Sequence, residues 1–128
     1  MSEEYKTCLV VDDSNVVRKV ARRITEDLGF NCLEAEDGQK ALQVCEEQMP
    51  DVIILDWNMP VMNGLEFLKE IRKTENGDGP KIIFCTTEND LENIQKAMEA
   101  GADEYIMKPF DSEIIETKFA QVGLLSVD

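Results

Sequence analysis

Three aspartates directly follow apolar runs of the kind that form buried strands. Asp12 and Asp13 come after residues 7–11, and Asp56 closes the run 51–56. If these runs are neighbouring parallel strands, the carboxylates converge, and at 4 Å each like-charged contact costs on the order of 4 kcal/mol. A proton or a divalent cation must then neutralise the cluster, and hard carboxylate oxygens suit Mg²⁺ better than zinc. The sequence therefore predicts a magnesium site.

A hydroxyl and an ammonium group follow two further apolar runs. Thr86 comes after residues 81–85 and Lys108 after residues 104–107. A cation, a lysine and a hydroxyl together can hold a phosphoryl group. The chain contains no histidine, which excludes Ser–His and Cys–His nucleophiles and histidine-based zinc sites. A carboxylate is left as the nucleophile, and its product would be an aspartyl phosphate.

The overall charge narrows the class of partner. The 128 residues include 27 acidic and 13 basic side chains, for a net charge of -14, which disfavours binding to nucleic acid or to anionic membrane. The first six residues are polar and no apolar run reaches the roughly 18 residues of a membrane span, so we expect a cytoplasmic protein. Four cysteines without a CxxC pair predict reduced, buried thiols; they are Cys8, Cys32, Cys45 and Cys85.

The elements that must position these groups alternate along the chain. Strands are predicted at 7–11, 31–35, 51–56, 81–85 and 104–107. Each is followed by a helical pattern; the helix starts and stops are marked by Gly29, Asp37-Gly38, Pro50, Asn63, Asn89, Gly101, Asp111 and Gly123. Five strand–helix units predict one α/β domain with a parallel sheet covered on both faces by five helices. A site in such a sheet lies at the carboxyl ends of the strands.

The spacing of apolar residues also predicts which helix positions face the sheet. The expected inward residues are Val17, Val20, Ala21, Ile24, Leu28, Leu65, Leu68, Ile71, Leu91, Ile94, Ala97 and Met98. The first helix carries a basic stripe of Arg18, Lys19, Arg22 and Arg23. We interpret this stripe as a solvated helix face, with the docking of a kinase or phosphotransfer helix bundle as the alternative.

The combined motifs resemble those of the receiver domain of two-component response regulators, most closely the single-domain, CheY-like chemotaxis type. The matching stretches are VDDS at 11–14, LDWNMPVMNG at 55–64, CTTE at 85–88, GADEY at 101–105 and KPF at 108–110. The resemblance covers residues 6–123 and implies a single receiver domain spanning 1–128. It also implies a doubly wound, flavodoxin-like sheet with strand order 2-1-3-4-5.

The resemblance further implies a role for each matching side chain. Asp56 would be the phosphoacceptor, taking its phosphoryl group from a sensor histidine kinase, a phosphotransfer protein or a small donor such as acetyl phosphate. Asp13, with Asp12 partly through water, would hold Mg²⁺ together with Asp56 and the backbone carbonyl of Asn58. Lys108 would pair with the phosphoryl oxygens, and its bond to Pro109 would be cis.

A switch and a lifetime are implied as well. Thr86 would move toward the phosphoryl group and Tyr105 would turn inward, which changes the partner preference of the face built by the fourth helix, fifth strand and fifth helix. In this family Asn58 and Glu88 lie where side chains tune the access of water to the acyl phosphate. Thr87 departs from the usual Ala or Gly, and its bulk could slow hydrolysis.

Several functions share these motifs. The leading hypothesis is a monomeric, non-enzymatic response regulator that binds a downstream protein, for which the flagellar motor switch is one candidate. A phosphate sink or a phosphorelay adaptor would need the same site. A Mg²⁺-dependent phosphohydrolase would place a second acid at Asn58, and a flavin carrier would need a hydroxyl-rich loop after the first strand.

Overall fold

A computed structural model describes residues 6–74, 79–86 and 91–125. Its strands are β1 (Thr7–Val11), β2 (Asn31–Ala35), β3 (Val52–Asp56), β4 (Lys81–Thr86) and β5 (Glu104–Met107). Its helices are α1 (Asn15–Asp27), α2 (Gly38–Glu47), α3 (Gly64–Lys73), α4 (Leu91–Glu99) and α5 (Ser112–Gln121). The predicted alternation of strands and helices is confirmed.

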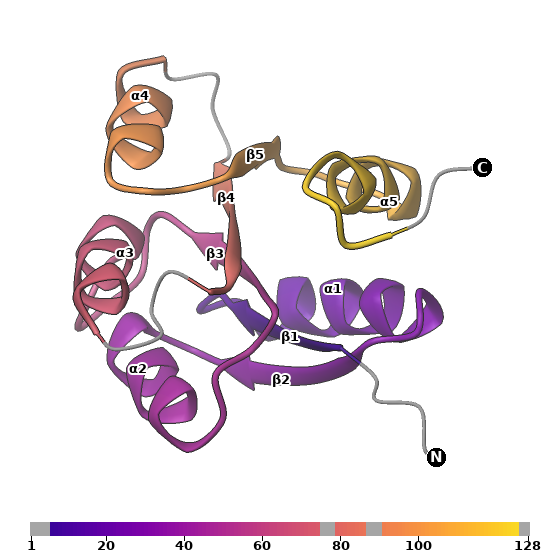
Figure 1. Ribbon diagram of the computed structural model, residues 1–128, viewed down its shortest axis with the longest axis horizontal. Helices are drawn as coiled ribbons and strands as arrows, with labels where there is room; N and C mark the ends of the chain where they lie inside the picture. Colours follow the sequence, from indigo (N-terminus) through magenta and orange to yellow (C-terminus); the bar gives the residue numbers. More distant parts are fainter. Residues whose placement is uncertain (1–5, 75–78, 87–90, 126–128) are drawn as a thin grey trace.

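The five strands form one parallel sheet in the order β2-β1-β3-β4-β5. Helices α2, α3 and α4 lie on one face, and α1 and α5 cover the other (Figure 1). The register places Val11 beside Leu55 and Thr86 beside Met107. The residues that follow these positions therefore meet at the carboxyl edge of the sheet, and the expected doubly wound, flavodoxin-like fold with order 2-1-3-4-5 is confirmed.

Helix termini follow local side-chain chemistry. Asn63, which the sequence marks as a helix boundary, caps α3 in a capping box with Glu66, and Asp111 caps α5 by accepting a hydrogen bond from the N–H of Ile114. Gly29, just beyond α1, has a φ of 95°, a left-handed conformation that glycine adopts without steric cost. The cap predicted at Asn89 lies outside the described residues.

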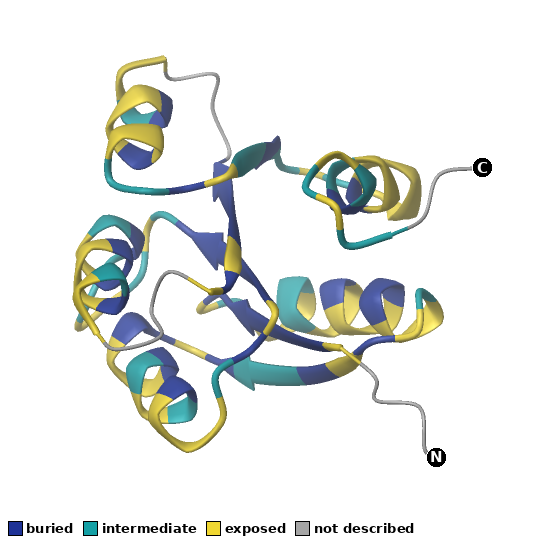
Figure 2. Cartoon of the chain, in the orientation of Figure 1, coloured by how far each residue is buried: buried dark blue, intermediate teal, exposed yellow. Residues whose placement is uncertain are grey.

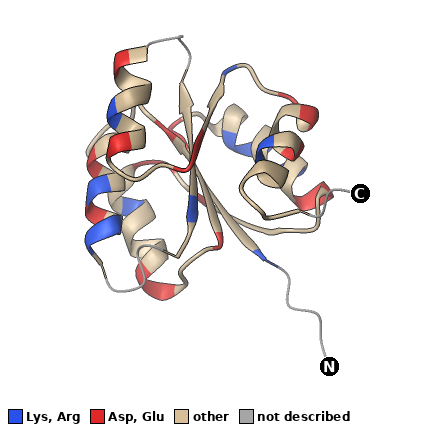
Figure 3. Ribbon diagram, turned by 45° about the horizontal axis from the view of Figure 1, so that its top comes forward, with Lys and Arg blue, Asp and Glu red and all other residues tan. Residues whose placement is uncertain are grey.

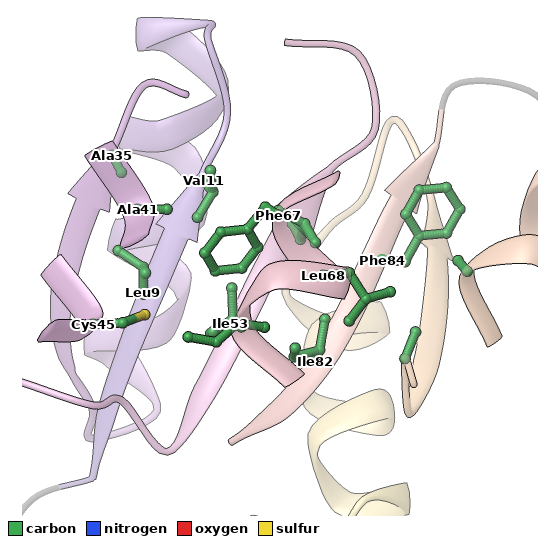
Figure 4. Packing of buried hydrophobic residues seen from close by; sticks show 14 of the residues in the cluster. Leu9, Val11, Ala35, Ala41, Cys45, Ile53, Phe67, Leu68, Ile82 and Phe84 are labelled. Carbon is green, nitrogen blue, oxygen red and sulfur yellow. The ribbon is translucent and has the colours of Figure 1, made fainter. Parts of the chain in front are cut away.

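The core consists of two apolar layers, one on each face of the sheet; the strands β1, β3 and β4 are almost entirely buried, whereas the edge strands β2 and β5 are partly covered (Figure 2). On the α2–α3 face, Phe67 and Leu68 pack over strand residues that include Ile53 and Ile82 (Figure 4). Phe67 is fully buried, and burying such a side chain contributes roughly 1.5–3 kcal/mol. The sequence prediction placed Leu65 on this face instead, but Leu65 is only half-buried.

Three residues predicted to face inward are exposed, so that part of the prediction was wrong. Val20 is 44% exposed, Met98 40% and Leu91 72%. In α1 and α4 the buried side chains form a narrower stripe along the helix than the sequence predicts. Thr25 of α1 is fully buried within this stripe. Helical periodicity identifies a stripe, whereas packing against the sheet selects how much of that stripe is covered.

At the amino edge of the sheet, Arg72 joins three segments. Its guanidinium donates to the carbonyl of Pro80 at 2.9 Å, to the carbonyl of Gly101 at 2.7 Å and to Asp103 Oδ2 at 3.1 Å. Asp103 Oδ2 also accepts from the N–H of Ile82 at 2.8 Å. We call Arg72, its three partners Pro80, Gly101 and Asp103, and Ile82 the Arg72 clamp; it ties α3 to the start of β4 and to the turn before β5.

Charged residues of both signs lie mainly along the helices, while the strands are mostly uncharged (Figure 3). Within the described part of the chain, none of the helices has both the length and the apolar character needed to cross a membrane. All four cysteines are buried and free, as the sequence predicts.

Candidate functional site

The turn after β1 brings two carboxylates to the carboxyl edge. Asp12 is 3% exposed, and its Oδ1 accepts a hydrogen bond from the N–H of Ser14 at 2.9 Å. Ser14 in turn caps α1 by accepting from the N–H of Val17 at 3.2 Å. Asp13, the next residue, is exposed. This turn thus presents one buried and one accessible carboxylate.

Asp56 ends β3 beside this pair and is 6% exposed. The start of α3 is held close by, because the N–H of Gly64 donates to the carbonyl of Trp57 at 3.0 Å. A Cβ on Gly64 would lie 2.2 Å from the carbonyl oxygen of Asp56. Only glycine therefore permits this close approach of α3 to the end of β3.

Lys108 connects the acids. Its Nζ donates to Asp12 Oδ2 at 2.6 Å and to Asp56 Oδ1 at 3.0 Å. Burial and the negative charge of Asp12 raise the pKa of Asp56, although Lys108 opposes the shift. Burial lowers the pKa of Lys108, but its two hydrogen bonds outweigh that effect and the net pKa is raised. Lys108 is therefore held as a cation between two carboxylates.

The three carboxylates form a group that fits a hard divalent cation. One oxygen each from Asp12, Asp13 and Asp56 lies within 4.8 Å of the others. Oxygen-only donors and an accessible side at Asp13 match the preference of Mg²⁺, which uses few protein ligands and keeps several waters. The convergence predicted from sequence is thus confirmed as geometry.

The predicted switch residues lie on adjacent strands. Thr86 is buried at the end of β4, and its carbonyl accepts from the N–H of Lys108 at 2.7 Å. Tyr105 of β5 is half-buried, with Lys118 Nζ 5.0 Å from its ring centroid. Lys118 also pairs with Glu104 at 3.2 Å. The predicted tuning residues Thr87 and Glu88 lie outside the described residues.

The loop after Asp56 is open to solvent. Asn58 is exposed, and Trp57 is half-buried with its ring edge-on to Phe84 at 4.9 Å. Val61 is 81% exposed and has a φ of 69°, a strained conformation for a β-branched residue. The bond between Lys108 and Pro109 is cis, as expected.

The basic stripe of α1 is only partly a solvated face. The side chain of Arg18 is 11% exposed and pairs with Glu34 of β2 at 3.1 Å. Arg22 pairs with the same carboxylate at 2.7 Å. The hydrogen bond from Arg22, and to a lesser extent the one from Arg18, lowers the pKa of Glu34. Lys19 and Arg23 are exposed. Sequence reasoning missed this network because nothing in the local pattern of Glu34 indicates its distant partners.

A groove of about 450 Å³ lies elsewhere, between α2 and α3, and has Cys45 and Ile71 among its lining residues. None of the predicted site residues that the structure describes lines it. The candidate site is therefore identified by the chemistry of the three carboxylates and not by the volume of this groove.

A doubly wound α/β sheet with an acidic, lysine-bridged group at its carboxyl edge offers the charges needed to hold a cation and a phosphoryl group. The family model of the response regulator receiver domain matches residues 8–120 of this chain. The chain therefore belongs to the receiver domains, the phosphoacceptor modules of two-component signalling, and its relatives are of the CheY type.

Individual relatives agree. The chain is 36% identical to chemotaxis protein CheY-3 of Vibrio cholerae over 115 residues, which cover 89% of this chain and 88% of that protein. It superposes on the structure of chemotaxis response regulator CheY4 of Vibrio cholerae with a TM-score of 0.88 and 34% identity, covering 93% of this chain and 99% of the other. The receiver domain of a sensor histidine kinase from Pseudomonas aeruginosa has a TM-score of 0.84 at 28% identity, covering 92% and 97% of the two chains; a magnesium ion is coordinated in its active site cleft.

Proposed function

We propose that this chain is a stand-alone response regulator whose Asp56 accepts a phosphoryl group from the phosphohistidine of a sensor kinase or phosphotransfer protein. One observation carries the proposal: Lys108 bridges Asp12 and Asp56 beside the exposed Asp13. An ion-paired lysine and two further acids around one buried carboxylate are suited to phosphoryl transfer.

The reaction follows from the positions of these groups. A carboxylate oxygen of Asp56 attacks phosphorus, the new P–O bond forms, and the P–N bond to the donor imidazole breaks with its electron pair returning to nitrogen. Lys108 Nζ lies 3.0 Å from Asp56 Oδ1, so its ammonium group can offset the negative charge of the phosphoryl oxygens as they arrive. We propose a phosphoacceptor with slow self-hydrolysis rather than an enzyme, which is supported by the membership of the chain in the receiver domains.

Magnesium would be held by Asp12, Asp13 and Asp56, together with the backbone carbonyl of Asn58. The donor set and the magnesium-containing receiver domain of Pseudomonas aeruginosa support this assignment. When bound, Mg²⁺ supplies positive charge that offsets the negative oxygens of the phosphoryl group. We propose Asn58, Thr87 and Glu88 as the residues that tune access of water to the acyl phosphate.

The output would be a change of surface. Thr86 at the end of β4 would turn its hydroxyl to the phosphoryl group, and Tyr105 of β5 would follow inward. Tyr105 now lies beneath the Lys118 ammonium of α5, so its movement would rearrange the face formed by α4, β5 and α5. The exposed Leu91 on α4 makes this face suited to a protein partner.

Phosphorylation is tested with labelled acetyl phosphate and Mg²⁺. We expect the wild type to take up label and Asp56→Asn to take up none, while Asp27→Asn, an exposed acid at the end of α1, behaves as wild type. Label on the Asp56→Asn variant would refute the assignment of the acceptor. Multiple turnovers of a small phosphomonoester at enzymatic rates would instead favour the phosphohydrolase.

The partner is tested by affinity capture with the phosphorylated protein. The chemotaxis names of the relatives favour a flagellar motor switch protein, and its phosphorylation-dependent capture would support motor control. Capture of the kinase alone would indicate a phosphate sink or a relay adaptor. We propose that the chain acts as a monomer in the cytoplasm, a reducing compartment that suits its four free thiols.

A further inference from the structure

We infer that Arg18 is a positioning residue that holds the turn carrying Asp12 and Asp13 in the form that binds magnesium. This inference rests on the proposed metal site. Arg18 Nη1 donates to the backbone carbonyl of Asp12 at 2.6 Å. Its Nε donates to Glu34 Oε1 at 3.1 Å, and its Nη2 donates to Asn15 Oδ1. One guanidinium thus joins the turn after β1, the first residue of α1 and the edge strand β2.

The bond to the carbonyl matters because that carbonyl belongs to the peptide between the two acids. The N–H of Asp12 is already fixed by donating to the carbonyl of Ala35 at 3.1 Å. Arg18 fixes the other side of the residue, and a planar peptide then sets where the Cα of Asp13 lies. Among the described residues, no hydrogen bond or ion pair restrains the Asp13 carboxylate itself. Its position therefore depends on the backbone that Arg18 holds.

The positive charge of Arg18 disfavours Mg²⁺ binding, whereas its hydrogen bonds to the turn favour it. A guanidinium bonded to the Asp12 carbonyl repels a nearby cation, although pairing with Glu34 at 3.1 Å offsets part of this repulsion. Removing the charge alone would therefore strengthen the binding of Mg²⁺. Loss of positioning would weaken it, as loss of the groups that orient metal ligands commonly does. The direction of the change separates the two roles.

The chain offers a matched control. Arg22 also pairs with Glu34, at 2.7 Å, but its hydrogen bonds go to Glu34 and Glu26 and not to the site. Arg18→Gln and Arg22→Gln therefore both remove a cation from the same carboxylate, and only the first releases the Asp12 carbonyl. Arg18→Lys keeps the charge but loses the fork that reaches three acceptors.

The experiment is an equilibrium titration of each folded protein with MgCl₂, followed by calorimetry and by Trp57 fluorescence, with far-UV circular dichroism to verify the fold. We expect Arg18→Gln to weaken Mg²⁺ binding by roughly tenfold and Arg18→Lys to fall between it and wild type. We expect Arg22→Gln to stay within about twofold of wild type, because it leaves the site backbone untouched. With acetyl phosphate, Arg18→Gln should need more Mg²⁺ for half-maximal phosphorylation yet approach the wild-type rate at saturation.

Unchanged or tighter binding by Arg18→Gln would overturn the inference, and so would equal weakening by both glutamine variants. If Arg18→Gln does not fold, the comparison of Arg18→Lys with Arg22→Gln decides, because equal affinities of these two would also overturn it. Failure of the wild type to bind Mg²⁺ would instead refute the proposed function, on which the inference depends.

Discussion

Replacing the proposed phosphoacceptor by its amide should make the protein more stable. Asp56 is 6% exposed and shares its surroundings with two other acids. The Asp56→Asn side chain keeps the shape and still offers an oxygen to Lys108. Lys108 also keeps its ion pair with Asp12 at 2.6 Å, so no cation is left unpaired by the change.

The magnitude follows from the distances. At an effective dielectric constant of 20, attraction to Lys108 at 3.0 Å is about 5.5 kcal/mol, and repulsion from Asp12, which has an oxygen within 4.8 Å, is at least about 3.5 kcal/mol. Asp13, also within 4.8 Å, adds at least about 3.5 kcal/mol before screening, and its exposure to solvent reduces this contribution by about half. These contributions nearly cancel, which leaves the cost of burying the Asp56 charge. We expect a gain of about 2 kcal/mol in the free energy of unfolding.

The assay is urea denaturation at pH 7 with EDTA, followed by circular dichroism. Glu116→Gln, which neutralises an exposed residue of α5, should change stability by no more than about 0.5 kcal/mol and controls for the lower net charge. Adding Mg²⁺ at a hundred times its Kd should stabilise the wild type by about 2.7 kcal/mol and close the gap. An Asp56→Asn variant no more stable than wild type in EDTA would refute the balance of charges described above.

Three further outcomes are expected. Arg72→Met removes the hydrogen bonds of the Arg72 clamp but keeps an apolar side chain. It should lower the free energy of unfolding by about 3 kcal/mol in urea titrations, because hydrogen bonds to charged groups are worth about 1.5–3 kcal/mol each. A loss below about 0.5 kcal/mol, as for an ordinary surface change, would contradict these hydrogen bonds. Glu34→Gln should cost about 1 kcal/mol at pH 7. Because pairing with Arg22 lowers the pKa of Glu34, this stabilisation is present above the unfolded-state pKa and is lost as pH falls through the lowered folded-state pKa. If the Glu34→Gln variant were destabilised by the same amount at every pH between 7 and 3, the ion pair would not be the cause. Burial raises the pKa of Cys85 to about 12, so a thiol reagent at pH 8 should label it only after unfolding in urea, and rapid native labelling detected by peptide mass spectrometry would disprove its burial.

The sequence was sufficient for the alternation of strands and helices because each of these elements carries local signals. Alternation of apolar strands with capped helices predicts a parallel sheet, and the capping box of Asn63 and Glu66 gives the start of α3 directly. The strand order came from family resemblance, since strand composition does not encode order. The errors at Leu91 and Met98 arose because periodicity does not report how far α4 stands from the sheet.

The candidate site was predictable to the extent that parallel strands share one edge. That rule places Asp12, Asp56 and Lys108 at the same edge, and the strand order implied by the resemblance makes the first and third strands neighbours. The fork of Arg18 was not predictable, because its acceptors are a backbone carbonyl and the distant Glu34, and neither has a sequence pattern. Its neighbours in the basic stripe have the same residue types but different surroundings, which only the tertiary structure distinguishes.

Because of the Arg72 clamp, substitutions at the two edges of the sheet should affect different properties of the protein. The carboxyl edge collects buried charge at the site, while the amino edge is held by hydrogen bonds to Pro80, Gly101 and Asp103. Substitutions near the clamp would change stability at the end of the sheet opposite the acceptor. To raise or lower the stability of this protein without changing the proposed phosphoryl chemistry, substitutions should therefore be made at the amino edge.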